Sequence, residues 1–378
     1  MKDNFQRNVL ILTHNYGGGS KIFLDQYIET ELKNCGVYVL KPEGTVTNPL
    51  NKPTQFLLID CRNPLESRLL NAEPQYLNYM LRELHITEIF LNHLIHFNLS
   101  FVANWIVSSK IPFTYFIHDY YCVCLNFRLD CHLQFCELSK VHPTCRYYLK
   151  ELQVWNWHKL WHDFLSAAKK IIAPSRYAAS IVKKFYPDLS IEVKPHILTL
   201  PLSRTFKQEF ALRERLRVTF LGRITEFKGE EYLLKLNAFV RRENLPVEFV
   251  VLGEYVDEVF AGTKEGIIFA GPYNGNFVSE KLAELETSMV AVLSNVPETY
   301  CYTASEAILS GYPVMALDIG AHVSRIIKND CGWIFPFERR DRGLGELQKF
   351  LRFISTPQGR NDILLKASNT ADFKNGME

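Results

Sequence analysis

The sequence predicts an α/β protein with two domains in tandem, each built on a doubly wound parallel sheet. Its 378 residues exceed what one hydrophobic core usually serves, since domains mostly hold about 100–200 residues. Short apolar runs alternate with segments long enough for helices, which is the pattern of strands buried on both faces of a parallel sheet. The same order of strand, glycine turn and helix begins again after residue 213.

The first half opens with an apolar run at residues 8–13, followed by Gly17, Gly18 and Gly19 and then by apolar residues at helical spacing. This order predicts a strand, a tight turn and a helix. Further strands are expected at Phe56–Ile59, Glu88–Leu91, Pro112–Ile117 and Lys170–Ala173. We assign residues 1–200 to this domain.

The second half predicts a strand at Leu216–Leu221, a turn over 222–229 and a helix at Glu230–Arg241. Later strands are expected at Val247–Leu252, Gly266–Phe269, Met289–Leu293 and Pro313–Leu317. We assign residues 201–355 to the second domain and Lys194–Arg213 to the linker. The helix Leu344–Ile354 and the tail 356–378 are expected to pack back on the first domain. Because open α/β sheets bind ligands at the carboxyl ends of their strands, two facing sheets would place a ligand cleft between the domains.

Composition excludes several classes of protein. Lys plus Arg total 43 and Asp plus Glu total 41, so the net charge of +2 gives no field for gripping nucleic acid. No apolar run reaches the length of about 18 residues that a membrane span requires, and the N-terminus does not resemble a signal peptide. These features predict a cytoplasmic protein, with peripheral contact to the inner face of the membrane left open.

Nine cysteines, an odd number, favour reduced thiols. Five of them lie in one stretch with two histidines: Cys122, Cys124, Cys131, Cys136 and Cys145, with His132 and His142. Zinc is one interpretation, but two close CxxC pairs are missing. Buried or loop thiols are therefore favoured, and no metal is expected.

Two constellations carry chemistry in the second half. Arg223 and Lys228 occupy the loop after a strand, where a planar guanidinium, an ammonium and a helix start suit a departing diphosphate. Glu298 and Glu306 are separated by seven residues, and carboxylates suit sugar hydroxyls because they accept two hydrogen bonds. Solvated loop charges are the alternative interpretation of both pairs.

This arrangement resembles glycosyltransferase family 4 (group 1), in which a Gly-Arg…Lys-Gly loop precedes a paired-glutamate motif. The matching segments, in the family's order, are Gly222–Gly229, Val251–Gly253, Ala270–Tyr273, Glu298–Glu306 and Glu306–Val314. The resemblance implies the GT-B fold, with two Rossmann-like domains facing across a cleft. It also implies a retaining, metal-independent enzyme without cofactor that uses a nucleotide sugar and a carbohydrate or lipid-linked glycan acceptor, in polysaccharide assembly at the cell surface.

By position, the resemblance implies that Arg223 and Lys228 hold the donor diphosphate beside Gly222 and that Glu298 contacts the donor sugar. It implies that Glu306 holds the ribose and that backbone groups near Tyr273 contact the base. Amides of Cys301, Tyr302 and Thr303 would face the sugar and phosphate. Many relatives carry a glycine-rich segment after the first glutamate, and the bulkier residues here are expected to reshape the sugar pocket.

The first half matches the family less closely. Gly17, Gly18 and Gly19 resemble its first loop, which approaches donor or acceptor, whereas Ile22 replaces the third glycine of a dinucleotide fingerprint and argues against a dehydrogenase. His118 follows a predicted strand where the family often carries an active-site histidine; a structural histidine is the alternative.

The stretch 147–170 is aromatic and basic, and includes Tyr147, Tyr148, Lys150, Trp155, Trp157, Trp161, Phe164, Lys169 and Lys170. Trp with Lys suits a membrane interface, but the aromatics form no single helical face, which favours a core helix slightly. Two other functions stay open: a GT-B sugar-nucleotide epimerase, which would turn over without acceptor, and a scaffold that binds sugar nucleotides without catalysis.

Overall fold

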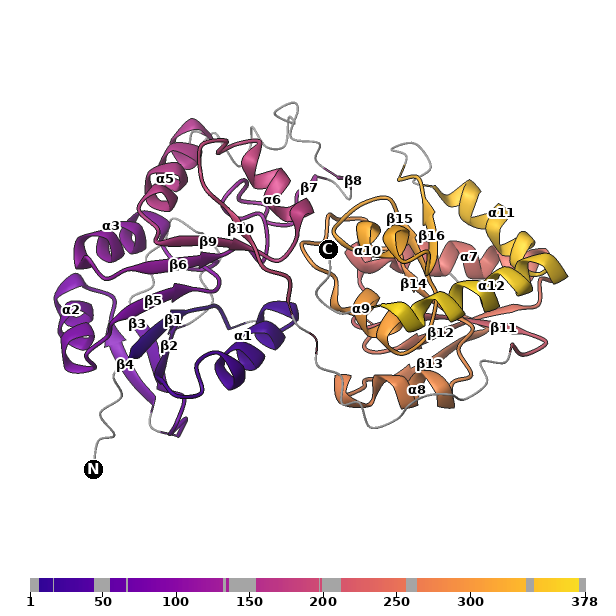
Figure 1. Cartoon of the computed structure of the whole chain (residues 1–378), viewed down its shortest axis with the longest axis horizontal. Coiled ribbons are helices and arrows are strands. Elements are labelled where there is room, and N and C mark those ends of the chain that lie inside the picture. The colour runs from indigo at the N-terminus through magenta and orange to yellow at the C-terminus, as the bar shows by residue number, and fades with distance from the viewer. Residues whose placement is uncertain are drawn as a thin grey trace. The chain divides into compact units, whose positions relative to one another are not determined.

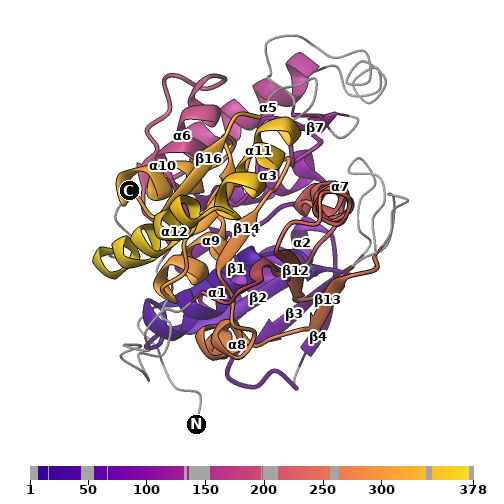
Figure 2. The same cartoon turned by 90° about the vertical axis from the view of Figure 1, so that its right-hand side faces the viewer.

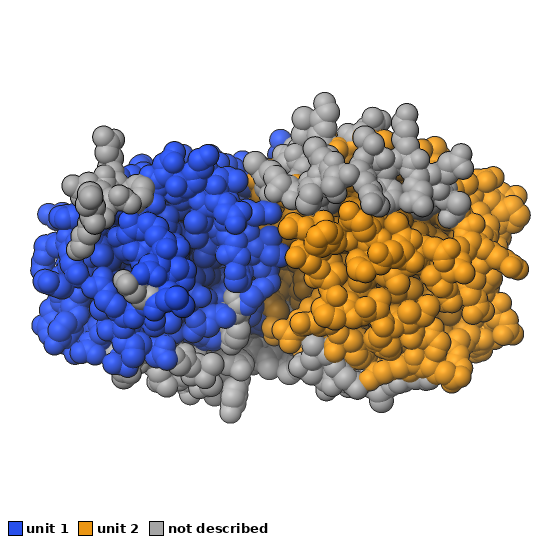
Figure 3. All heavy atoms as spheres, turned by 90° about the horizontal axis from the view of Figure 1, so that it is seen from below, with its two compact units in different colours: residues 1–127, 143–194 blue, residues 128–142, 195–378 orange. Residues whose placement is uncertain are grey.

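The protein is described here by a computed structural model, which covers residues 7–15, 17–43, 55–65, 67–131, 134–135, 154–196, 198, 212–255, 264–337 and 343–373 (Figure 1). The chain divides into two compact units, coloured separately in Figure 3. Unit 1 comprises Met1–Phe127 and Pro143–Lys194, and unit 2 comprises Arg128–His142 and Pro195–Glu378. The division at Lys194 lies within the expected linker, of which residues 199–211 are outside the described residues.

Unit 1 is built on a sheet with the order β10-β9-β6-β5-β1-β2-β3-β4. Its strands are β1 (Asn8–Leu12), β2 (Gly36–Pro42), β3 (Gln55–Asp60), β4 (Ser67–Asn71), β5 (Glu88–Leu91), β6 (Phe113–Phe116), β9 (Lys170–Ala173) and β10 (Glu192–Val193). Its helices are α1 (Gly19–Thr30), α2 (Pro74–Glu83), α3 (Leu99–Ser109), α5 (Val154–Ser166) and α6 (Arg176–Lys183). The strands from β10 to β2 are parallel, as expected.

The edge of this sheet differs from the expectation of parallel strands throughout. The segment around Phe56–Ile59 is a strand, but β3 pairs antiparallel with β2 and β4 pairs antiparallel with β3. Side chains of β3 alternate between buried and half-buried, which fits a strand with one face in the core. An antiparallel pair needs no helical crossover, so the short connection between β3 and β4 is sufficient.

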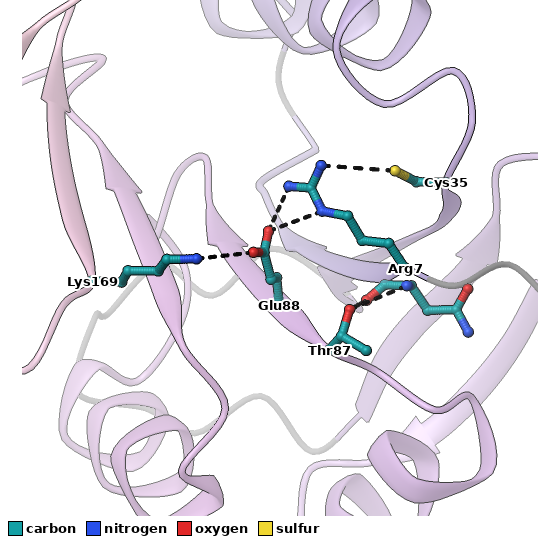
Figure 4. Close-up of polar contacts among 6 residues, drawn as sticks. Arg7, Cys35, Thr87, Glu88 and Lys169 are labelled. Carbon is teal, nitrogen blue, oxygen red and sulfur yellow. Dashed lines mark hydrogen bonds and ion pairs between the residues drawn. The ribbon is translucent and has the colours of Figure 1, made fainter.

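A charged cluster fixes the amino ends of three strands of unit 1 (Figure 4). Arg7, just before β1, donates from Nη2 to Glu88 Oε2 at 2.5 Å, and Lys169, just before β9, donates to Glu88 Oε1 at 3.1 Å. Burial is the largest single influence and opposes the charged form of Glu88, but the hydrogen bonds and charges of Arg7 and Lys169 together outweigh it and lower the pKa of Glu88. The cluster lies at the edge opposite to the one where such sheets bind ligands.

Unit 2 contains a fully parallel sheet with the order β13-β12-β11-β14-β15-β16. Its strands are β11 (Leu216–Leu221), β12 (Val247–Leu252), β13 (Ile267–Gly271), β14 (Met289–Val292), β15 (Val314–Leu317) and β16 (Gly332–Phe335). A separate two-stranded ribbon joins β7 (Asp130–Cys131) and β8 (Gln134–Phe135). The helices of unit 2 are α7 (Glu230–Arg242), α8 (Val278–Glu284), α9 (Tyr302–Leu309), α10 (His322–Lys328), α11 (Leu344–Ile354) and α12 (Pro357–Asn369). Unit 2 also has the short 3₁₀ turns η1 (Glu226–Lys228), η2 (Gly275–Phe277) and η3 (Thr370–Asp372).

Two hydrophobic cores cover the two faces of the unit 2 sheet, and helices flank the strands in both views (Figures 1 and 2). Val218 and Phe220 face a core shared with α7 and α11, whereas the next residue, Leu221, faces a core shared with α8, α9 and α10. This alternation follows from the two-residue period of a strand. The sheet is therefore doubly wound.

The described part of the C-terminal tail packs within unit 2, and its expected contact with the first domain stays a prediction. Ile363 of α12 is fully buried in the core of unit 2. Trp333 Nε1 on β16 donates to Asp362 at 2.7 Å. Apolar and polar contacts together therefore hold residues 357–373 within the second unit.

Candidate functional site

Two glycines bring the loops after β11 and β12 into contact. Gly222 has φ +97° and Gly253 has φ +145°, a backbone region that favours glycine. A Cβ built on Gly253 would lie 1.9 Å from the carbonyl oxygen of Gly222, so no side chain fits there. A Cβ on Gly222 would lie 3.1 Å from Cγ2 of Thr303, which places this loop beside the start of α9.

The turn that carries Lys228 is held by the segment after β14. Ser294 Oγ donates to the carbonyl oxygen of Phe227 at 3.0 Å, and the Asn295 amide donates to the same oxygen at 3.1 Å. Lys228 Nζ then forms an ion pair with Glu298 Oε1. Two residues that the sequence places in separate motifs thus meet at the carboxyl edge of the unit 2 sheet.

The two charges of this pair stabilise each other. Burial opposes both charged forms, but attraction to the partner outweighs it, so the pKa of Lys228 is raised and the pKa of Glu298 is lowered. The Glu298 side chain is 16% exposed and that of Lys228 is 45% exposed. Lys228 is therefore a fixed positive charge that a ligand can reach.

Arg223 lies in the same loop, but it is not bound tightly. Its Nε is 3.6 Å from Oε2 of Glu254, and both side chains are about two-thirds exposed, at 65% and 64%. A weak surface pair of this kind contributes little to stability. The guanidinium can therefore change partner when an anion arrives.

Glu306 lies on α9 and is 5% exposed. The hydroxyl of Tyr273 donates to its Oε2 at 2.7 Å. Burial raises the pKa of Glu306, and this hydrogen bond offsets only part of the effect. The sequence assigned only backbone groups near Tyr273 to the site, so the contact of its side chain with Glu306 is a further finding.

The segment Thr299–Thr303 passes from the first glutamate to α9. Cys301 has φ +69°, an uncommon value for a residue other than glycine. The hydroxyl of Tyr300 donates to the carbonyl oxygen of His196 at 2.6 Å, and the hydroxyl of Tyr302 lies 3.0 Å from Nδ1 of the same residue. Both tyrosine side chains are directed to His196, and sequence reasoning gave no signal for this contact.

In unit 1, three strand ends position a chain of polar groups. Asn92 directly follows β5, and Thr13 directly follows β1. Asn92 donates from Nδ2 to Thr13 Oγ1 at 3.0 Å. His118 Nε2, after β6, lies 2.8 Å from Asn92 Oδ1. Because the Asn92 oxygen can only accept, His118 carries its proton on Nε2 when neutral, and Nδ1 is then an acceptor. Asn92 was missed, although it directly follows a predicted strand.

A second polar pair borders His118. His93 Nε2 forms an ion-pair contact with Asp119 Oδ2, and the His93 ring packs against that of His14 in a tilted arrangement with centroids 4.1 Å apart. Burial, followed by the charge of His93, lowers the pKa of His14 to about 3, so His14 is neutral at physiological pH. Three histidines of unit 1 thus lie at the carboxyl edge of its sheet.

The glycine turn lies at the same edge. Gly18 has φ +87°, and a Cβ built on Gly17 or Gly18 would meet no heavy atom within 4 Å. Gly19 begins α1, whose Phe23 packs against His118 with ring centroids 4.8 Å apart. Within unit 1, the glycine turn and His118 therefore lie close together, as predicted site residues. Within unit 2, the structure brings together Gly222, Lys228, Glu298 and Thr303. The pair formed by Glu306 and Tyr273 lies beside them.

The aromatic stretch 147–170 has a structural role where it is described. Trp157, Trp161 and Phe164 are 5%, 0% and 2% exposed, and Trp157 Nε1 donates to the carbonyl oxygen of Tyr121 at 3.2 Å. These three aromatics belong to the core of unit 1, as the favoured interpretation of a core helix expects. Residues 147–153 and the side chain of Trp155 lie outside the described residues.

The cysteine stretch, for which zinc was the less favoured interpretation, lies mostly outside the described part of the chain, which leaves out Cys136, Cys145, His132, His142 and the side chain of Cys131. Within the described ranges, no group of three or more His, Cys, Asp or Glu residues is arranged to hold a metal ion. Cys122 is fully buried, and burial raises the pKa of its thiol. Among the helices covered by the structure, none has the length and apolar character of a membrane span.

One family model matches a part of the chain that lies in the second unit. Residues 215–347 match the family model described as "Glycosyl transferases group 1". Every predicted site residue of the second half falls within this stretch. Comparison with curated proteins finds no relative.

Solved structures resemble the whole chain. HepE from Anabaena, solved with UDP, has a TM-score of 0.64 and 14% identity, and the match covers 96% of this chain and 93% of that one. Sucrose-phosphate synthase from Thermosynechococcus elongatus has a TM-score of 0.62 and 11% identity, with 97% and 94% covered. A glycosyltransferase from Rickettsia africae has a TM-score of 0.58 and 12% identity, with 98% and 94% covered. The chain therefore has the GT-B fold, with two Rossmann-like units.

Proposed function

We propose that the protein is a glycosyltransferase that moves a sugar from a nucleotide-diphosphate donor to a carbohydrate or lipid-linked glycan acceptor. The observation that carries the proposal is the Lys228–Glu298 ion pair at the carboxyl edge of the unit 2 sheet, within the stretch that matches the group 1 family model. HepE was solved with UDP and with UDP-glucose, which supports a nucleotide sugar as donor.

In this proposal, Arg223 and Lys228 bind the donor diphosphate. Arg223 is exposed and weakly paired, so it can turn to phosphate oxygens at small cost, and the half-exposed Lys228 adds a positive charge that a phosphate can reach. As the bond to the sugar breaks, negative charge grows on the diphosphate, and fixed cations stabilise that charge more than they stabilise the ground state.

The carboxylates select the sugar parts of the donor. Glu306, oriented by Tyr273, binds the ribose hydroxyls, and Glu298 binds hydroxyls of the transferred sugar. The amides of Cys301, Tyr302 and Thr303 lie at the start of α9, where a helix favours anions. The side chains of Tyr300 and Tyr302 are buried. In this proposal the backbone of the segment therefore contacts the donor.

We infer a retaining reaction in which the leaving phosphate takes the proton of the acceptor hydroxyl on the same face of the sugar. This route requires neither a metal nor a cofactor, because Arg223 and Lys228 supply the counter-charge. His118, oriented by Asn92, contacts the donor sugar, and the Gly17–Gly19 turn gives donor or acceptor close approach to α1. The acceptor belongs to cytoplasmic assembly of cell-surface polysaccharide.

The test is thermal unfolding of the protein with UDP, GDP, dTDP, CMP and their sugars, without added metal. A ligand that binds only the folded state raises the melting temperature by mass action. We expect a selective increase that disappears in Arg223→Ala and in Glu306→Ala. Arg242→Ala, an exposed cation at the far end of α7, is the matched control and should retain the shift. If no nucleotide or nucleotide sugar in the panel raises the melting temperature, the proposed donor site is wrong, and a non-catalytic scaffold becomes the better proposal.

A further inference from the structure

Arg325 on α10 is buried to an unusual degree for an arginine, with 2% of its surface exposed. Its Nη2 donates to the carbonyl oxygens of Tyr300 and Cys301, the latter at 3.2 Å, and its guanidinium carbon lies 4.3 Å from the centroid of the Tyr300 ring. Its Nε and Nη1 have no hydrogen-bond partner among the described residues. Burying such a group is costly, so a role beyond packing is expected.

The peptide geometry makes the contact informative. In a trans peptide the C=O and the following N–H point in opposite directions, and no described peptide of the chain is cis. When Arg325 holds the carbonyl of Tyr300, the amide of Cys301 points away from it. The carbonyl of Cys301 fixes the amide of Tyr302 in the same way. Arg325 therefore sets the direction of the first two amides that precede the body of α9.

The same loop is held at its other end. The amide of Ala321 donates to the carbonyl oxygen of Glu298 at 2.9 Å. A Cβ built on Gly320 would lie 2.9 Å from the nitrogen of Glu298, so only glycine allows the two backbones to approach this closely. The segment from Glu298 to Cys301 is thus fastened along residues 320–325, and its left-handed residue Cys301 is held without glycine.

Arg325 also supplies charge. After burial, which is the largest cause, its positive charge lowers the pKa of His196 to about 3. Burial, Arg325 and Lys228 together outweigh the charge of Glu298 and lower the pKa of His322 to about 4. Both histidines are therefore neutral near pH 7. Arg325 therefore keeps a positive charge beside these neutral histidines, and it lies behind the amides of Cys301 and Tyr302.

We infer that Arg325 is a positioning residue of the donor site, which directs the amides of Cys301 and Tyr302 to the phosphate groups of the nucleotide. The inference rests on the proposed function and deepens it, because it explains how a donor loop without glycine acquires the backbone shape that anion binding requires. Arg325 itself does not touch the donor.

The experiment compares Arg325→Met and Arg325→Lys by calorimetric titration with UDP and, separately, with uridine, which lacks the phosphates. We expect Arg325→Met to weaken UDP binding at least ten-fold and uridine binding less than two-fold. Arg325→Lys, which keeps a donor and a charge, should recover a large part of the loss. Lys328→Met removes an exposed charge from the same helix and should bind UDP as the wild type does.

Two results overturn the inference: equal UDP binding by Arg325→Met and wild type, or equal losses for UDP and uridine. If Arg325→Met does not fold, hydrogen exchange of the wild type decides. UDP should then protect the amides of residues 300–303, and unchanged exchange there in the UDP-bound protein overturns the inference. Arg223→Ala separates the two proposals. If it weakens UDP binding while Arg325→Met does not, only this inference fails; if wild type binds no UDP, GDP or dTDP, both fail.

Discussion

Lys228 and Glu298 form an ion pair although they are 70 positions apart in the sequence. Lys228 follows the loop after β11, and Glu298 follows β14, the neighbouring strand of the sheet. Because the strands are parallel and adjacent, their carboxyl ends meet, and the pair is a direct product of the strand order. Its two members also differ in exposure, which decides how each responds to substitution.

Substitution of Lys228 by Met should destabilise the protein by about 1–2 kcal/mol, because it leaves Glu298 largely buried without its partner. The half-exposed position of Lys228 limits the loss. Urea unfolding at pH 7.5 measures it, with Lys235→Met, an exposed lysine paired with Glu231 on α7, as control. Adding Glu298→Gln should restore most of the stability, and a double variant as unstable as Lys228→Met would contradict the coupling.

Glu306→Gln should stabilise the protein and abolish nucleotide binding. Burial raises the pKa of Glu306, so the folded state takes up a proton more readily than the unfolded state. The free energy of unfolding therefore falls as pH rises from the pKa of Glu306 in the unfolded chain through its raised pKa in the folded protein. A neutral amide removes this cost and still accepts the hydrogen bond from Tyr273, but presents one acceptor instead of a carboxylate to the ribose. A lower melting temperature for the variant would refute this explanation.

Gly253→Ala should prevent folding or cost more than about 3 kcal/mol, because the new methyl group would overlap the Gly222 carbonyl. Gly18→Ala is the matched control, since Gly18 also has positive φ but has open space around it. It should cost about 1–3 kcal/mol of backbone strain, because φ +87° and ψ −161° lie in a region that almost only glycine adopts. Circular dichroism melting distinguishes the two variants, and similar melting temperatures would exclude the steric explanation.

Stability should decrease as pH falls below about 6.5. His322 has a folded pKa of about 4 because of burial, so the unfolded state takes up a proton first as pH drops. At pH 5 this one residue accounts for about 2 kcal/mol, and above pH 6.5 the effect vanishes. His322→Leu should reduce the difference between pH 7.5 and pH 5 by that amount in denaturant titrations; an unchanged difference would assign the acid sensitivity to other groups.

Asn92→Leu should lower turnover at least ten-fold with little change in donor affinity, because His118 loses the oxygen that orients its Nε2–H. The measurement is steady-state kinetics with the nucleotide sugar that thermal unfolding identifies. Asn98→Leu, a substitution at the N-cap of α3, is the control and should affect stability rather than turnover. A parallel loss of donor affinity and turnover in Asn92→Leu would mean that the residue supports the fold and not His118.

Sequence patterns predicted the parallel strands well, because a strand buried on both faces is a short run of apolar residues bounded by turns. β11 and β12 have the predicted bounds. β2 (Gly36–Pro42) was missed, although six of its seven residues are buried, because a run that ends in Lys and Pro resembles a loop. β4 was missed because four of its five residues are exposed and no apolar alternation marks them.

The donor-side residues were predictable as motifs, but their contacts were not. Spacing of Glu298 and Glu306 indicated two roles, yet the partners Lys228 and Tyr273 depend on which strands are adjacent. Arg325 gave no signal, since an arginine on a short helix normally faces solvent. The contacts of Tyr300 and Tyr302 with His196 were equally hidden, because more than 100 positions separate them.

Cys301 gives the donor loop a chemical property as well as a shape. Its thiol is buried beside Glu298, and desolvation followed by that negative charge raises its pKa. A thiol that stays protonated reacts slowly with alkylating agents and oxidants. The loop should therefore tolerate oxidising conditions and maleimide labelling. Any inactivation by such reagents would report partly exposed cysteines, such as Cys35 or Cys124, rather than chemistry at the donor loop.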